Sequence, residues 1–166
     1  MDANVGQLFI PIIEKPHFES FSGIPVKKIR DNAITEIDVK GLEDSKLEAC
    51  GGVILAHCLK SNSSVTVVAV SSNNLGVEGG KALAECLKSN TTLAAIVLSG
   101  KNGSKVTIHA DQLRQNTVET LDYSGQGLHV DGASFIVAEL LKSNSSVTKV
   151  SAFADVRKKR SLFRFC

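Results

Sequence analysis

Residues 59–66 read LKSNSSVT, and the same eight residues recur without a change at residues 141–148. Between them lies LKSNTTL at residues 87–93, and a weaker copy, LRQNTV, occupies residues 113–118. The leading leucines of the four copies are spaced 28, 26 and 28 residues apart. An eight-residue identity in phase with two further copies indicates an internal repeat, with a period inside the range of roughly 20–29 residues used by leucine-rich repeats.

Each copy is followed by an apolar pattern of period two and then by one of helical period. After the first copy, Val68 and Val70 alternate with other residues as in a buried strand, and Leu83 and Leu87 share one helical stripe. One repeat is therefore a strand, a turn, a helix and a loop. The predicted strands are Ile34–Val39, Val65–Val70, Leu93–Leu98, Val118–Tyr123 and Val147–Ala152, and further helices are expected around residues 52–60 and 131–142.

Neither half of such a repeat can bury its apolar face alone, so the repeats must stack. The pattern predicts an α/β fold: a short right-handed solenoid with a parallel sheet on the concave face and helices on the convex face. We expect all five strands to form one parallel sheet in chain order.

Residues 73–93, NNLGVEGGKALAECLKSNTTL, resemble the ribonuclease-inhibitor-like class of leucine-rich repeats. This class includes the Ran GTPase-activating protein, NOD-like receptors and tropomodulin, and it is essentially eukaryotic. The resemblance covers roughly residues 34–156 and implies a role in protein binding. It also implies that Asn73, at a strand end, hydrogen-bonds the backbone of neighbouring turns.

The chain departs from the pattern of this class in two respects. The positions aligned with Asn73 hold other residues, namely Leu42, Lys101, Gln126 and Asp155. The third unit is two residues short and carries His109 at a position expected to face the core, where neighbouring units have Leu55, Leu83 and Val137. The array of four to five repeats is therefore degenerate.

Segments with a different composition flank the array. Residues 1–33 are apolar and interrupted by three prolines, and we interpret them as a cap over the open end of the solenoid, with a docking segment as the alternative. The basic and apolar tail, residues 157–166, carries five cations. We interpret it as a segment that contacts RNA or an acidic surface, or as a nuclear import signal; the alternative is a solvated chain end. The cations are Arg157, Lys158, Lys159, Arg160 and Arg164.

The composition excludes several classes of function. The net charge of +2 gives no field over the whole chain that would attract nucleic acid or a membrane, and the first residues contain neither a signal peptide nor a run long enough to span a bilayer. The four cysteines lack CxxC spacing, which favours a reducing compartment and argues against a metal site or disulfide. We expect a cytoplasmic protein, with nuclear or cytoskeletal placement as alternatives.

No catalytic constellation is evident. Residues 76–81, GVEGGK, have Leu75 where a phosphate-binding loop needs its first glycine, and the histidines are scattered without a nucleophile beside them. Cys58 and Cys86 occupy the same place in adjacent helices and are expected to be small core residues. Asn62, Asn90 and Asn144 begin formal glycosylation sequons, but their place in the repeated loop indicates a structural role. We expect no catalytic residue, metal, cofactor or small-molecule substrate.

The most informative surface is the strand face opposite the helices. Its predicted centre is Val67, Ala69, Ala95 and Val97, where a solvated sheet face would carry polar residues. The further candidates on this face are Thr120, Asp122, Lys149 and Phe153. The expected function is a non-catalytic protein–protein interaction module, a subunit or adaptor of a larger assembly whose partner the sequence does not name. The alternatives are a GTPase-activating protein, a cytoskeleton-associated protein, or an RNA-contacting subunit of a ribonucleoprotein.

Overall fold

A computed structural model of the 166-residue chain describes residues 3–39, 47–100, 103–126, 128 and 133–151. Strands and helices alternate through most of this part of the chain. The helices are α1 (Ala3–Ile13), α2 (Val26–Arg30), α3 (Glu48–Lys60), α4 (Gly76–Ser89), α5 (Ala110–Arg114) and α6 (Ala133–Leu141). The strands are β1 (Glu36–Asp38), β2 (Val67–Ala69), β3 (Ala95–Ser99), β4 (Lys105–His109), β5 (Thr120–Asp122) and β6 (Lys149–Ser151).

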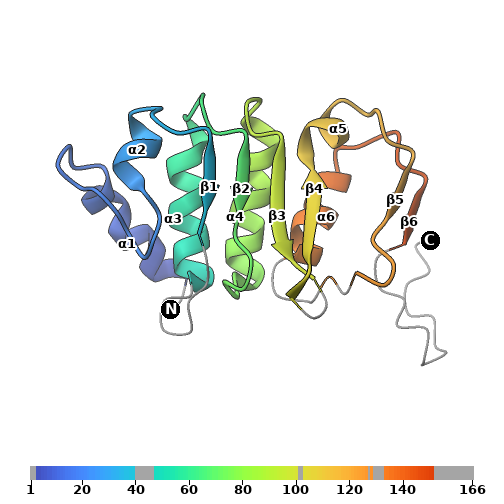
Figure 1. Ribbon diagram of the computed structural model, residues 1–166, viewed down its shortest axis with the longest axis horizontal. Helices are drawn as coiled ribbons and strands as arrows, with labels where there is room; N and C mark the ends of the chain where they lie inside the picture. The colour runs from blue at the N-terminus through green and yellow to red at the C-terminus, as the bar shows by residue number, and fades with distance from the viewer. Residues whose placement is uncertain (1–2, 40–46, 101–102, 127, 129–132, 152–166) are drawn as a thin grey trace.

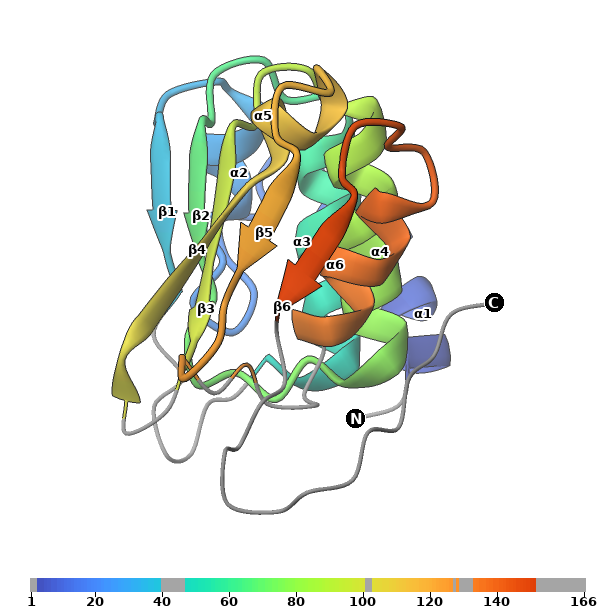
Figure 2. The same ribbon diagram turned by 90° about the vertical axis from the view of Figure 1, so that its right-hand side faces the viewer.

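The strands form one layer and the long helices a second layer behind it. Figure 1 shows β1 to β4 as a row with α3 and α4 behind them, and Figure 2 shows α3, α4 and α6 on the same side of the strands. Leu83, Leu59 and Leu87 are fully buried between the two layers, as the repeat alignment requires. The α/β class is thereby confirmed, and consecutive repeat strands pair in parallel in three cases: β1 with β2, β2 with β3, and β5 with β6.

The prediction of one parallel sheet through all five repeats was wrong. β1, β2 and β3 pair in parallel and in chain order, but β3 then pairs antiparallel with β4, a strand that the repeat alignment did not predict. β5 and β6 form a separate parallel pair. The described chain thus contains a four-stranded and a two-stranded sheet.

The third repeat unit departs from the template because its sequence favours a hairpin at this point. Gly103 adopts a positive φ of 77°, and the Gly100 amide donates to the Ser104 carbonyl oxygen at 2.6 Å. The segment after this turn, KVTIH, buries Val106 and Ile108 and exposes the residues between them, which is the alternation of a half-buried strand. The expectation that His109 faces the core was wrong as well, since His109 ends β4 on the exposed side.

The loop asparagines have the structural role predicted for them. Nδ2 of Asn90 donates to the carbonyl oxygens of Leu59 and Asn62, while its Oδ1 accepts from the amides of Thr92 and Leu93. Asn62 and Asn144 have the same pattern, each donating to the carbonyl at the end of an earlier helix and accepting from amides of its own loop. These bonds hold consecutive units at a fixed distance.

Asn73, at the end of β2, also behaves as the family resemblance implies. It is 1% exposed, donates to the Val39 and Ser71 carbonyls, and accepts from the Leu47 amide. Gln126, at the aligned position of a later unit, is exposed and donates only within its own turn, to the Asp122 carbonyl. The other aligned positions, Leu42, Lys101 and Asp155, lie outside the described residues.

The N-terminal segment packs against the first repeat helix. α1 lies along α3, and Ile13, Ile24 and Ile29 join the main apolar core. Leu8 and Ile12, on the other side of α1, are 73% and 39% exposed. The interpretation of residues 1–33 as a cap stays a prediction. Among the described residues, no helix is both long and apolar enough to cross a membrane.

Candidate protein-binding face

Strand register brings the four central candidate residues together. Val67 lies beside Ala95 and Ala69 beside Val97 in the parallel pairing of β2 with β3. Because successive residues of a strand point to opposite faces, these four side chains share one face. The alternating residues Val68 and Ile96 are fully buried in the core, on the side of the strands where Figure 2 shows α3 and α4, so the four residues lie on the opposite face. We call these four residues the central patch.

The central patch exposes less apolar surface than its composition suggests. Ala69 and Ala95 are 8% and 6% exposed, and only Val67 and Val97 are partly exposed. The two valines lie diagonally across the patch, with the two small alanines beside them. The patch can therefore receive apolar groups of a partner, but its area is small.

Polar rows border the central patch on both sides. Glu36 and Asp38 of β1 lie beside Val67 and Ala69, and both are exposed. On the other side, His109 and Thr107 of β4 lie beside Ala95 and Val97, and Lys105 lies beside Ser99. Sequence reasoning missed this second row because it did not predict β4. The signal that could have found it was the alternation in residues 105–109 after a glycine-rich turn.

The remaining candidate residues of this face lie elsewhere. Thr120 pairs with Lys149 across β5 and β6, and Asp122 is exposed on the same two-stranded sheet. Hydrogen bonds from Ser124 lower the pKa of the Asp122 carboxyl. Since β5 does not pair with β4, these residues do not continue the central patch. Phe153 and the five cations of the tail, residues 157–164, lie outside the described residues.

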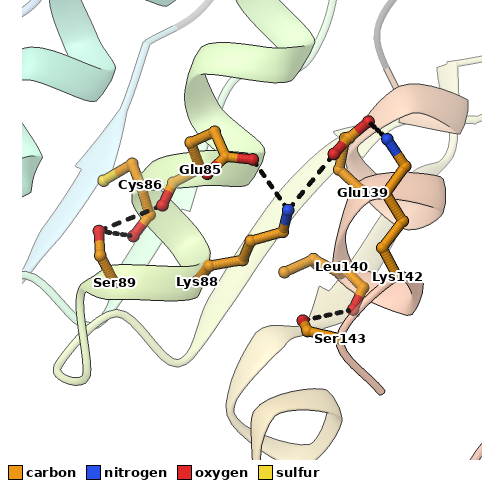
Figure 3. A network of polar contacts seen from close by, with 8 residues as sticks. All are labelled: Glu85, Cys86, Lys88, Ser89, Glu139, Leu140, Lys142 and Ser143. Carbon is orange, nitrogen blue, oxygen red and sulfur yellow. Dashed lines mark hydrogen bonds and ion pairs between the residues drawn. The ribbon is translucent and has the colours of Figure 1, made fainter. Parts of the chain in front are cut away.

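Charged side chains on the helix side form contacts between helices α4 and α6. Lys88 of α4 donates to Glu85 in its own helix and to Glu139 of α6, and Glu139 also pairs with Lys142 (Figure 3). The bond to Lys142 and the bond to Lys88 lower the pKa of the Glu139 carboxyl, and the bond to Glu85 raises the pKa of Lys88. These contacts join α4 directly to α6, because the third unit supplies only the short α5 in place of a full repeat helix.

A small cavity lies between α1, α2 and α3. It has a volume of about 170 Å³, and Ile13, Arg30, His57 and Cys58 contribute to its lining. This is below the roughly 300–1,000 Å³ of typical small-molecule sites. Arg30 donates to the carbonyl oxygens of Ile13, Lys15, Pro16 and Phe18, and His57 contacts Glu14 at 3.0 Å. The polar groups of this cavity are therefore used within the protein.

The cysteines in the described part of the chain are free thiols. Cys86 is buried, as predicted, whereas Cys58 is only partly buried. Burial raises the pKa of both thiols to about 11, so neither is a reactive thiolate at neutral pH. No group of three or more potential metal ligands occurs among the described residues.

Comparison with known proteins finds similarity among solved structures. No family model matches the chain, and no curated protein matches it. Among solved structures, the chain is similar to Leiomodin-1 Actin-Binding Site 2, with a TM-score of 0.48 and 21% sequence identity. The match covers 82% of this chain and 81% of that chain. The actin binding in that name belongs to the leiomodin domain.

Proposed function

We propose that this protein is a non-catalytic protein–protein interaction module, a subunit or adaptor of a eukaryotic intracellular assembly, and that the central patch is its contact surface. The observation that carries the proposal is the placement of Val67 and Val97, partly exposed, in the middle of a strand face that no described helix covers. Apolar side chains grouped on an open sheet face are typical of a contact surface.

The polar rows support the same proposal. An interface usually consists of an apolar centre within a polar rim that fixes the orientation of the partner. Glu36 and Asp38 supply acidic groups on one side of the patch, while Lys105 supplies a basic group in the β4 row on the other. This asymmetry favours a partner with cationic groups over β1 and anionic groups over β4.

The substitution Val97→Asp tests the proposal. It would place an unpaired carboxylate in a desolvated interface and should weaken partner binding by on the order of 3 kcal/mol, about a hundredfold. In the free protein the same side chain faces water, so the melting temperature should stay within a few degrees of the wild-type value. The binding measurement is quantitative mass spectrometry of proteins that co-purify with the tagged full-length chain.

Val150→Asp is the matched control. Val150 is a 43% exposed valine in β6, outside the central patch, so this variant should retain the partners that Val97→Asp loses. Identical sets of partners for wild type and Val97→Asp would contradict the proposal. A melting temperature that collapses in Val97→Asp alone would show that another part of the same chain covers the patch.

A further inference from the structure

The two short helices, α2 and α5, occupy equivalent positions in the two halves of the chain. Arg30, at the end of α2, donates to the Ile13 carbonyl at the end of α1. Arg114, at the end of α5, donates in the same way to the Leu87 carbonyl at the end of α4. Each short helix is thus fastened by an arginine to the end of the long helix that comes before it.

The loops that follow the two short helices are equivalent as well. Asn32 and Asn116 both adopt a positive φ, 51° and 54°, and their Oδ1 atoms accept from the amides of Ser63 and Ser145. The segment LRQNTV, residues 113–118, is therefore the counterpart of IRDNAI, residues 29–34. Further pairs, whose hydroxyls donate to equivalent carbonyls before β1 and β5, are Ser64 with Ser146 and Thr66 with Thr148. The described parts of residues 26–69 and 110–151 thus form two copies of one module, in the order short helix, strand, long helix, strand.

Helix α1 takes the same place before the first module as α4 takes before the second. α3 packs on α1 and α6 packs on α4, and the carbonyls of Ile13 and Leu87 at the helix ends are bound by equivalent arginines. The other side of α4 packs on α3, whereas the other side of α1 faces away from the rest of the described chain (Figure 1). The face of α1 that corresponds to the α3-binding face of α4 is therefore open.

The open face of α1 carries large apolar side chains. Gly79 of α4 lies against the backbone of α3, and the residues that follow it on the same helical face are Ala82 and Cys86. When α1 and α4 are aligned at the carbonyls that the arginines bind, the counterparts of these three residues are Val5, Leu8 and Ile12. Leu8 and Ile12 are 73% and 39% exposed, and α1 contains no charged residue. This face is suited to pack against the apolar side of another helix.

The opposite end of the molecule is open at positions that are covered in the first module. Val68 of β2 is fully buried, whereas its counterpart Val150 of β6 is 43% exposed. Three further pairs are buried in the first module and partly or fully exposed in the second, namely Ala56 with Ala138, Leu59 with Leu141 and Val65 with Val147. In the first module α4 and β3 follow and pack on α3 and β2. No described element packs in this way beyond α6 and β6.

We propose that copies of this chain associate head to tail, with α6 and β6 of one copy against α1 of the next. The contact repeats, between two copies, the junction at which α4 packs on α3 within one chain. It covers Leu8, Ile12 and Val150, which are the exposed large apolar residues of the described chain. Because the two contacting surfaces differ, the interface is heterologous, and association continues beyond a dimer. This inference is independent of the central patch, which lies on the strand face.

Sedimentation equilibrium of the full-length protein over a wide range of concentration tests the proposal. The average mass of the wild type should rise with concentration and pass that of a dimer. Leu8→Asp places a charge on the open face of α1, and Val150→Asp places one at the α6–β6 end. Each substitution should weaken association by on the order of tenfold or more. Val97→Asp is the matched control, because it places the same charge in the central patch, away from both ends, and should associate as the wild type does.

A mixture of the two end variants tests the direction of the contact. Leu8→Asp keeps an intact α6–β6 end, and Val150→Asp keeps an intact α1, so one junction can form between them. At a concentration at which the wild type associates and each variant alone is monomeric, the equimolar mixture should form dimers and nothing larger. Sedimentation velocity distinguishes these species.

Four results would overturn the proposal. The wild type stays monomeric at every concentration; the mixture of end variants stays monomeric; or Val97→Asp loses association, which would place the contact on the central patch. In the fourth, Val150→Asp still dimerises while Leu8→Asp does not, which would identify a symmetric pairing of two α1 helices. Circular dichroism and thermal unfolding establish that each variant is folded. If Val150→Asp is unfolded, Ala138→Asp, at an exposed position of α6, replaces it in every experiment.

Discussion

At the scale of single residues, one side chain per unit satisfies the carbonyl at the end of an earlier helix. Asn62, Asn90 and Asn144 do this in the repeated loops, where the sequence identity located them. Arg30 and Arg114 do the same at the ends of α1 and α4, donating to the carbonyls of Ile13 and Leu87. A cation at the C-terminal end of a helix is also favoured by the helix dipole.

The arginine contacts could not be predicted from the repeat. Arg114 reaches Leu87, 27 residues earlier, and a second carbonyl at Leu93, so its role depends on how α5 lies over the end of α4. The shortened α5 has no asparagine that reaches the end of α4, and a long side chain with several donors takes its place. Alignment of the copies shows the position of Arg114 but not this contact.

The first prediction concerns Asn90→Ala. The substitution removes a side chain that bonds two carbonyls and two amides in a buried loop, so it should lower the free energy of unfolding by roughly 2–5 kcal/mol. Urea unfolding followed by circular dichroism measures the change. Thr91→Ala, an exposed position in the same loop, is the control and should change stability by about 0.5 kcal/mol or less. Similar midpoints for the two variants would contradict the role assigned to Asn90.

At the scale of elements, the sequence predicted the strands and the long helices that repeat and missed β4, which does not repeat. The strands β1, β2, β3, β5 and β6 lie inside the predicted segments or within one residue of them, and α3, α4 and α6 occupy the predicted helical stripes. β4 was missed because the third unit was aligned to a helical template. Val106 and Ile108 are buried and alternate with exposed residues, which is the local pattern of a strand. This pattern was given less weight than the repeat alignment. The two central strands of the candidate face were thus predicted, whereas its β4 border was missed although residues 105–109 carry the alternation of a strand.

The close packing of α3 on α4 leads to the second prediction. A Cβ atom added to Gly52 would lie 2.7 Å from the Gly79 Cα, a backbone atom that a rotamer change cannot move aside. Although alanine favours a helix by about 1 kcal/mol over glycine, Gly52→Ala should destabilise the protein by roughly 1–3 kcal/mol because the two helices must separate. Thermal unfolding measures the change. Lys60→Ala, at an exposed position of α3, is the control and should be nearly neutral. A melting temperature in Gly52→Ala equal to or above that of the wild type would show that the helices do not approach so closely.

At the scale of the whole molecule, two sheets share one core. The apolar cluster runs from Ile13 in α1 to Leu140 in α6 without a break between the units. The ion pair of Lys88 with Glu139 is a second connection, between α4, which packs behind the first sheet, and α6, which packs behind the second. The interruption of the sheet between β4 and β5 therefore need not divide the protein into independently folding units, since the core and the α4–α6 contact both cross it.

This arrangement predicts a single cooperative unfolding transition. The chain contains one tyrosine, Tyr123, and no tryptophan, so its intrinsic fluorescence reports on the end of β5 alone. Tyr123 is 8% exposed in the folded protein and will enter water on unfolding. Far-UV circular dichroism reports mainly on the helices, most of which precede the interruption. Because the two parts share a core, both signals should give the same midpoint in a urea titration. If the tyrosine signal changes at a lower urea concentration than the helical signal, then β5, β6 and α6 unfold separately, and the interruption in the sheet is also a boundary of cooperativity.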